Sequence, residues 1–123
     1  MKRIIVCGGR DYDDAARIRR VLQKVWAKHP GATLVQGGAR GADRLAREWA
    51  RANAVPFEEY PADWERDGIR AGFTRNKKMI ELPGVIGVVA FPGGPGTAMM
   101  KTLTRARKIP LYDLDPKKEE PKK

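Results

Sequence analysis

The sequence is poor in the residues that bind metals and act as nucleophiles. It holds one cysteine and one histidine in 123 residues. A lone cysteine forms no disulfide within the chain, and paired histidines or cysteines at metal-ligand spacing are absent. His29 ends a predicted helix beside Pro30-Gly31, where a polar helix cap is the ordinary role of such a residue. The sequence therefore does not indicate a Ser-His-Asp catalytic triad. We expect no metal site and no bound cofactor, and we interpret Cys7 as a small buried residue rather than a nucleophile.

Long apolar runs are also lacking. No stretch is long enough to span a bilayer, and Ile4-Ile-Val-Cys7 is too short for a targeting region. A single cysteine suits a reducing compartment. We therefore expect a cytoplasmic protein with no membrane contact.

Acidic residues are scarce relative to basic ones, with 15 Asp and Glu against 25 Lys and Arg, and the formal net charge is +10. Such an excess indicates an anionic partner or a solvated basic face. The basic residues of 17–28 fall mostly on the outer side of a predicted helix. Residues 116–123 form a charged tail with nothing to bury, which we expect to be disordered. No nucleic-acid-binding motif accompanies the charge, so a nucleic-acid partner is the less favoured hypothesis.

What the sequence does contain is a regular alternation of apolar runs and amphipathic segments. Strands are predicted at residues 2–7, 32–36, 57–60, 85–91 and 110–114. Helices are predicted at residues 13–28, 41–54, 65–81 and 97–108. The alternation predicts an α/β fold, a three-layer Rossmann-like sandwich whose parallel five-stranded sheet has the order 3-2-1-4-5. At this length we expect one domain over residues 1–115.

Apolar stripes on the last two helices predict which sides pack on the sheet. The stripe of residues 65–81 consists of Ile69, Phe73, Asn76 and Ile80. The stripe of residues 97–108 consists of Met99, Leu103 and Ala106. We expect both stripes to face inward.

Glycine-rich turns follow three of the predicted strands: Gly8-Gly9-Arg10-Asp11, Gly37-Gly-Ala-Arg-Gly-Ala-Asp43 and Pro92-Gly-Gly-Pro-Gly-Thr97. The carboxyl ends of parallel strands share one sheet edge, so these loops should converge on one crevice. Glycines let backbone N–H groups approach an anion closely, and helix N-termini favour phosphates. We therefore predict a phosphate- or nucleotide-binding site, against the alternative of three tight turns. The predicted contacts in these loops are Gly8, Gly9, Arg10, Asp11, Gly37, Gly38, Ala39, Arg40, Gly41, Asp43, Pro92, Gly93, Gly94, Gly96 and Thr97.

The polar side chains of the loops have alternative roles. Arg10 and Arg40 are candidates to bind a phosphate. Asp11 orients Arg10 or holds its loop, and the alternative is a surface ion pair of little energy. Asp43 either caps the following helix or accepts a hydrogen bond from a ribose hydroxyl. Thr97 is predicted to cap the last helix.

Two further side chains outside the glycine loops are candidates for contact with a base. Trp64 lies in an irregular segment after the third strand, where it either stacks on a base or plugs the sheet edge. Asn76 offers a donor and an acceptor to a base edge, although an asparagine on an apolar stripe needs a partner in any case.

Two segments resemble a known family. Arg75-Asn-Lys-Lys-Met79 and Pro92-Gly-Gly-Pro-Gly-Thr97 are similar to the paired motifs of the Lonely Guy (LOG) proteins, phosphoribohydrolases that release a base from a nucleoside 5′-monophosphate. The wider SLOG group also includes the DNA-processing protein DprA. Within it, the chain resembles the YspA-type (YspA, cpYpsA-related) branch in Val6-Cys-Gly-Gly-Arg-Asp-Tyr12, in the loop of residues 37–43, and in Ala62-Asp-Trp64 followed by an Ala-Gly-x-x-Arg-Asn motif.

The resemblance spans about residues 3–112 and implies a SLOG-like nucleotide-binding domain. It assigns to Arg75 a functional role in binding a phosphate or ribose. A homodimer is left open, since LOG-type relatives commonly pair. The implied partner is a nucleotide-type small molecule.

One departure from the LOG pattern bears on activity. The glutamate pair that follows the Pro-Gly-Gly-x-Gly-Thr loop in LOG enzymes is replaced here, within Ala98-Met99-Met100. A thioether cannot stabilise the oxocarbenium-like charge of glycosidic cleavage. A binding module or sensor is therefore the first hypothesis, with the catalytic residues left unassigned. The second is an N-glycosidic hydrolase or transferase that uses Asp11, Asp43 or Asp63, and the third is a DprA-like nucleic-acid binder.

Overall fold

The computed structural model describes residues 1–115, and the predicted tail of residues 116–123 lies outside the described residues. The elements run in the order β1 (Arg3–Cys7), α1 (Ala15–Lys28), β2 (Thr33–Gln36), α2 (Ala42–Ala52), β3 (Phe57–Glu59), α3 (Trp64–Asp67), the 3-10 helix η1 (Gly68–Arg70), α4 (Ala71–Ile80), β4 (Val85–Ala90), α5 (Pro95–Ala106) and β5 (Leu111–Asp113). All strands are parallel, in the order β3-β2-β1-β4-β5. The predicted fold class and strand order are confirmed.

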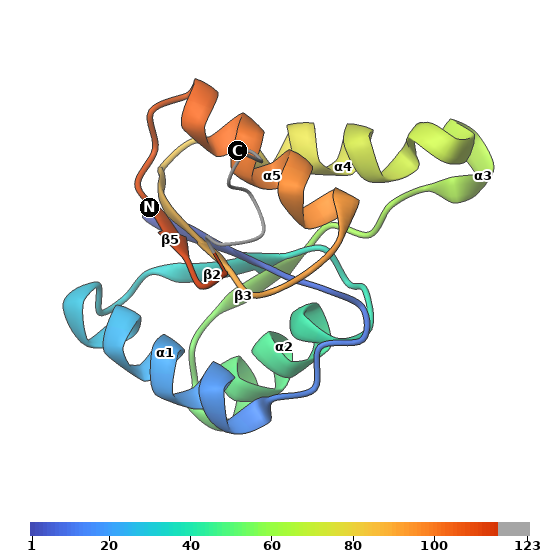
Figure 1. Cartoon of the computed structure of the whole chain (residues 1–123). Helices are drawn as coiled ribbons and strands as arrows, with labels where there is room; N and C mark the ends of the chain where they lie inside the picture. Colours follow the sequence, from blue (N-terminus) through green and yellow to red (C-terminus); the bar gives the residue numbers. More distant parts are fainter. Residues whose placement is uncertain (116–123) are drawn as a thin grey trace, which may run out of the picture.

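The sheet is the middle of three layers (Figure 1), with α1 and α2 on one face and α3, α4 and α5 on the other. Strands covered on both faces are largely apolar, as β1 is from Ile4 onward and β4 is throughout. One core cluster joins α1 and α2 to the sheet through residues that include Ile18, Leu22, Trp26 and Trp49. The second joins α4 and α5 to the opposite face through Met79, Ile80 and Met100. Within residues 1–115, no helix is long and apolar enough to cross a membrane.

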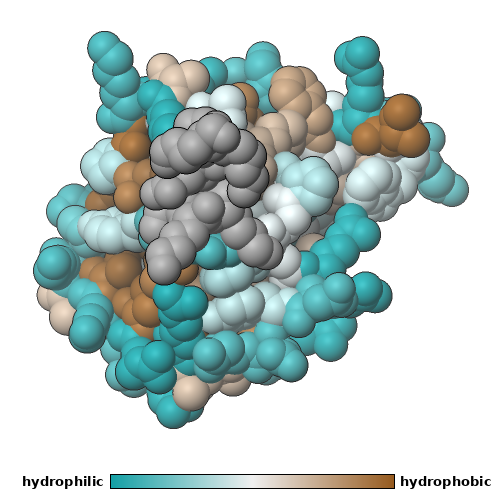
Figure 2. Space-filling view, in the orientation of Figure 1, coloured by the Kyte–Doolittle hydropathy of each residue, from teal (hydrophilic) through white to brown (hydrophobic). Residues whose placement is uncertain are grey.

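The helix predicted over residues 65–81 is broken in two. Gly68 adopts a φ of +59°, and α3 ends there. Ile69 lies in η1, directly after the break, and Phe73 lies in the first turn of α4. Ile69 is 98% exposed and Phe73 46% exposed, so their predicted burial is wrong, while Asn76 and Ile80 are buried as predicted. Figure 2 shows hydrophobic side chains at the surface beside α3, in keeping with these exposures.

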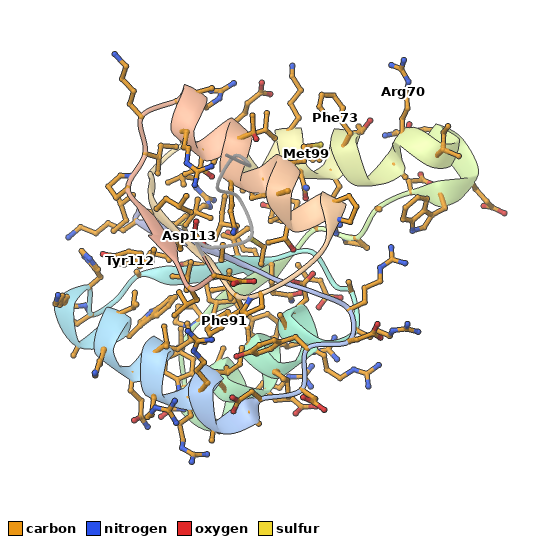
Figure 3. The ribbon with its side chains drawn as sticks, viewed as in Figure 1. Arg70, Phe73, Phe91, Met99, Tyr112 and Asp113 are labelled. Atoms are coloured by element: carbon orange, nitrogen blue, oxygen red, sulfur yellow. The ribbon has the colours of Figure 1, made fainter. Side chains whose placement is uncertain are left out.

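The helix predicted over residues 97–108 begins earlier, at Pro95, with Gly94 at the N-cap position. Proline suits the first turn of a helix because a backbone N–H at that position would have no carbonyl partner, so its absence in proline costs no hydrogen bond. Thr97 therefore lies inside the helix, and its predicted capping role is wrong. The side of α5 that is buried also differs from the predicted stripe. Met100 and Thr104 are buried, whereas Ala106 is exposed, and Met99 is half-buried on the layer that also carries Phe73 (Figure 3).

Candidate functional site

The three glycine-rich loops meet at the carboxyl ends of β1, β2 and β4. They surround a cleft of about 690 Å³, called here the main cleft. A hollow of about 360 Å³, called here the side pocket, adjoins it and shares five of its lining residues: Arg10, Gly37, Ala39, Trp64 and Arg75. The convergence follows from the reversal of the strand order between β1 and β4, where open parallel α/β sheets form their crevice.

The structure brings most of the predicted contacts together. The predicted residues that line the main cleft are Gly8, Gly9, Arg10, Asp11, Gly37, Ala39, Asp43, Trp64, Arg75, Asn76, Pro92, Gly93, Gly94, Gly96 and Thr97. Gly38 and Arg40 line the side pocket instead. Gly41 lines neither space.

Sequence reasoning missed other lining residues. These are Val6, Cys7, Tyr12, Gly72, Met79 and Pro95 in the main cleft, with Pro61 and Ala62 in the side pocket. Gly72 and Met79 lie about one helical turn from Arg75 or Asn76 along α4, so helical spacing around the predicted residues would have found them. No comparable sequence signal indicates Pro61 or Ala62.

Gly9 ties the three loops into one unit. Its N–H donates to the Pro92 carbonyl at 2.9 Å, and its own carbonyl accepts from the Ala42 N–H at 3.1 Å. Gly41 packs so closely on the Gly9 and Arg10 carbonyls that a Cβ would collide with them, and its φ is +77°. Gly41 therefore holds two loops together and does not face the main cleft.

Backbone amides of the second glycine-rich loop, residues 37–43, donate hydrogen bonds to the protein's own side chains. Asp43 Oδ2 accepts hydrogen bonds from the Gly37 and Ala39 N–H groups, both at 3.2 Å. The Gly38 N–H donates to Gln36 Oε1 at 2.6 Å. The N-cap of α2 is Gly41, so the prediction that Asp43 caps this helix is wrong: its carboxylate holds the preceding loop instead.

Asp43 is buried, and its environment favours the protonated acid. Burial raises the pKa of its carboxyl to about 6, against the opposing effects of the Ala39 N–H and the nearby Arg75 guanidinium. Both hydrogen bonds end on Oδ2, which leaves Oδ1 with no protein donor among residues 1–115. The main cleft thus contains a carboxyl group that titrates near neutral pH.

Arg75 and Asn76 connect the second loop to the start of α5. Arg75 Nη1 donates to the Gly37 carbonyl at 2.7 Å, and Nε donates to Asn76 Oδ1 at 2.9 Å. Asn76 Nδ2 donates to the Gly96 carbonyl at 3.2 Å. Burial lowers the pKa of Arg75. Asn76 already has protein partners for its acceptor and for one donor, so its main effect is to hold Arg75 and the last loop in place.

The wall between the two spaces carries an aromatic ring and a cation. Trp64 is 51% exposed and lines both spaces, so the alternative that it plugs the sheet edge is wrong. The Arg10 guanidinium carbon lies 5.6 Å from the Trp64 ring centroid. Asp11 does not pair with Arg10. Its carboxylate accepts from Arg40 Nη2 at 3.3 Å, and both side chains of this pair are mostly exposed.

The N-terminus of α5 opens into the main cleft. The first hydrogen bond of this helix runs from the Ala98 N–H to the Gly94 carbonyl at 3.0 Å. The Gly96 and Thr97 amides precede it, so no carbonyl of the helix accepts from them. The helix dipole adds partial positive charge at the same point. This is the arrangement at which phosphates bind in other α/β folds.

Other groups considered in the sequence lie elsewhere or are unreactive. Cys7 is only partly buried and lines the main cleft, so its interpretation as a buried residue is wrong. Desolvation by its surroundings raises the pKa of the thiol to about 12, which keeps it protonated and unreactive. Asp63 accepts from the Arg66 N–H at 3.1 Å as the N-cap of α3, outside the main cleft. Met100 lies in the core below α5. Among the described residues, no group of three or more His, Cys, Asp or Glu side chains is placed to hold a metal ion.

The sheet order and the cleft at its carboxyl edge define a Rossmann-like α/β domain. The chain belongs to the YAcAr family, the YspA, cpYpsA-related SLOG family, whose model matches residues 2–66. The resemblance to the YspA-type branch is thereby confirmed. The chain is also 33% identical over 126 residues to the Gene 61 protein of Mycobacterium phage D29, covering 95% of this chain and 99% of that protein.

A solved structure shares the fold. The X-ray structure of TM1055, a structural genomics target, is similar with a TM-score of 0.61 and 19% sequence identity. The similarity covers 90% of this chain and 72% of that one. At this identity the similarity supports the fold alone.

Proposed function

We propose that this domain binds a nucleotide or a nucleotide-derived phosphorylated ligand in the main cleft, as a sensor or binding module. One observation carries the proposal: the first-turn amides of α5 at Gly96 and Thr97, which have no hydrogen-bond partner among residues 1–115, lie at the same cleft as Arg10 and Arg75. Amides, a helix dipole and guanidinium groups all favour a phosphoryl group. Membership of the SLOG family supports the same class of ligand.

The size and lining of the main cleft fit the rest of a nucleotide. Its volume of about 690 Å³ lies within the usual range for small-molecule sites. The half-exposed Trp64 ring lies at its wall and offers a surface on which a base can stack. The Met99 and Met100 side chains do not line the cleft and cannot supply the carboxylate of LOG enzymes, which supports binding rather than catalysis in the LOG manner.

Calorimetry with a panel of mono-, di- and cyclic nucleotides and ADP-ribose-type ligands tests the proposal. Thr97→Val removes a hydroxyl group from the cleft wall while keeping the shape of the side chain, and we expect it to weaken binding about five- to tenfold. The control is Thr102→Val on the exposed side of α5, which should leave affinity within about twofold. No binding by any member of the panel would contradict the proposal.

A second candidate function is cleavage or transfer at the N-glycosidic bond. It is favoured by Asp43, whose carboxyl lines the main cleft with a raised pKa of about 6 and an Oδ1 without a protein donor. Of the three acids considered, Asp11 is exposed and Asp63 is an N-cap, so Asp43 is the one that fits. The test is release of free base from nucleoside monophosphates. Asp43→Asn should then abolish turnover, whereas an inactive wild-type protein would eliminate this candidate.

We also propose the cytoplasm as the location, because a single cysteine suits a reducing compartment.

A further inference from the structure

We propose that the side pocket is a second phosphoryl subsite, so that the preferred ligand carries a pyrophosphate group: a nucleoside 5′-diphosphate or a larger nucleotide linked through a diphosphate. The inference rests on the proposed function, since it assumes that the first phosphoryl group binds at the N-terminus of α5. It adds a second anion site and thereby narrows the class of ligand.

The two spaces are placed to receive adjoining groups of one molecule. The side pocket, of about 360 Å³, is about half the volume of the main cleft and opens beside it. Arg10, Trp64 and Arg75 line both spaces. A ligand that fills the main cleft therefore meets the side pocket at these residues.

Charge in the side pocket comes from three guanidinium groups. Arg10, Arg40 and Arg75 line it. Arg10 stacks over Trp64, and no carboxylate pairs with it among residues 1–115. Arg10 and Arg75 line the same two spaces, so the two cations lie near each other. Burial lowers the pKa of Arg75, and the Arg10 charge adds to this effect while Asp43 opposes it. An anion placed between them relieves this repulsion.

The carboxylates around the side pocket offset only part of this charge, and Asp43 is the one that acts on Arg75, whose pKa it raises. Asp43 accepts from loop amides, and Glu59 accepts from Gln36 Nε2 at 2.7 Å and Arg47 Nη1 at 3.1 Å. Asp11 does pair with Arg40, but the pair is exposed and spans 3.3 Å. Such a pair contributes little in water, so a phosphoryl group carrying more charge can replace Asp11.

The two subsites bind phosphate by different means. At α5 the donors are backbone amides. At the side pocket the amides of Gly37, Gly38 and Ala39 already have partners, so recognition falls to the side chains. Arg40 is the lining guanidinium that belongs to the side pocket alone, and it is therefore the residue that separates the two subsites in an experiment.

The experiment is calorimetry with matched pairs of probes: AMP and ADP, GMP and GDP, and inorganic phosphate and pyrophosphate. For the wild-type protein we expect the diphosphate of a bound pair to bind at least tenfold more tightly than the monophosphate. Arg40→Gln should remove most of that advantage and change monophosphate affinity less than about twofold. Arg44→Gln, an exposed arginine on α2 outside both spaces, makes the same change of net charge and should preserve the advantage.

A variant expected to strengthen diphosphate binding, rather than weaken it, completes the test. Asp11→Asn frees Arg40 and removes a negative charge, so we expect it to tighten diphosphate binding a few-fold. Equal affinities for mono- and diphosphates, or an Arg40→Gln variant that behaves like Arg44→Gln, would overturn the second subsite while leaving nucleotide binding intact. Failure of every nucleotide to bind the wild-type protein would instead overturn the proposed function.

Discussion

Asp43 is the residue on which the shape of the second loop depends most directly. Its carboxylate accepts two loop N–H groups while it is buried beneath the main cleft. Burial raises its pKa in the folded protein to about 6, from 3.8 for the free side chain. The protonated form is therefore favoured by folding, so its contribution to stability is greatest below pH 3.8 and is lost as the pH rises through 6.

The loss of the Asp43 contribution to stability as the pH rises can be measured. Asp43→Asn keeps an acceptor oxygen and cannot ionise, so the free energy of unfolding of the wild type minus that of the variant should fall by about 2 kcal/mol between pH 4 and pH 7. Urea denaturation across this range measures the difference. Asp13→Asn, at an exposed position, should show no comparable fall. A difference for Asp43→Asn that does not vary with pH would contradict the burial argument.

Gly41 provides a second prediction at the scale of single residues. Gly41 and Gly31 both have positive φ, +77° and +85°, but a Cβ at Gly41 would collide with the backbone of the first loop while Gly31 has open space around it. We expect Gly31→Ala to lower the free energy of unfolding by about 1 kcal/mol from backbone strain alone. Gly41→Ala should lower it by about 3 kcal/mol or more. Equal losses in denaturant titrations would show that the contact between the loops is unimportant.

The sequence predicted which residues line the cleft better than what each residue does. Glycines after strands are visible in the sequence, and topology brings them to one edge. The pairing of Asp11 with Arg40 and the contact of Arg75 with the Gly37 carbonyl join residues far apart in the chain. Such contacts depend on the packed positions of several loops, which no local pattern encodes.

At the scale of elements, the sequence predicted where helices and strands exist but erred on the phase of two helices. Gly68 breaks the helix predicted over 65–81, and Pro95 starts α5 earlier than Thr97. The inward side of α5 also carries a charge: Lys101 is buried because its Nζ pairs with Asp113 Oδ1 at 2.9 Å. Because this lysine lowers the apparent hydrophobicity of the buried side of α5, the apolar stripe in the sequence predicted that a different side of the helix is buried.

The short helix α3 gives a prediction through its first residue. Trp64 is half exposed, whereas Trp26 and Trp49 are buried, so acrylamide should quench mainly Trp64 fluorescence. We expect a bound nucleotide to protect this signal, and Trp64→Phe to abolish the protection and weaken affinity about fivefold or more through lost stacking. Inorganic phosphate has no ring and should give no protection. Unchanged quenching at saturating nucleotide would place the base away from α3.

At the scale of the molecule, the fold was predictable because alternating strands and helices leave few topologies once crossovers are right-handed. The main cleft follows from that topology, and its position at the β1–β4 switch needs no particular side chain. The side pocket was not predictable. It depends on how the segment after β3 returns over the second loop, bringing Pro61 and Ala62 beside Arg40.

The net charge of +10 gives the prediction that belongs to the whole chain. If the charge serves mainly as a solvated surface, single-stranded DNA should bind weakly near physiological salt and lose affinity steeply as salt rises. Nucleotide binding should depend on salt only modestly, since few phosphates are contacted. Fluorescence anisotropy of labelled DNA, with nucleotide as competitor, measures both. DNA that binds more tightly than any nucleotide would favour the DprA-like alternative.

The most direct test of the account is a crystal structure of the protein with a nucleoside 5′-monophosphate at a concentration that saturates binding. We predict phosphate oxygens within hydrogen-bond distance, about 2.7–3.2 Å, of the Gly96 and Thr97 amides, with the base toward Trp64. A phosphate bound elsewhere, with the first turn of α5 contacting only solvent, would contradict it.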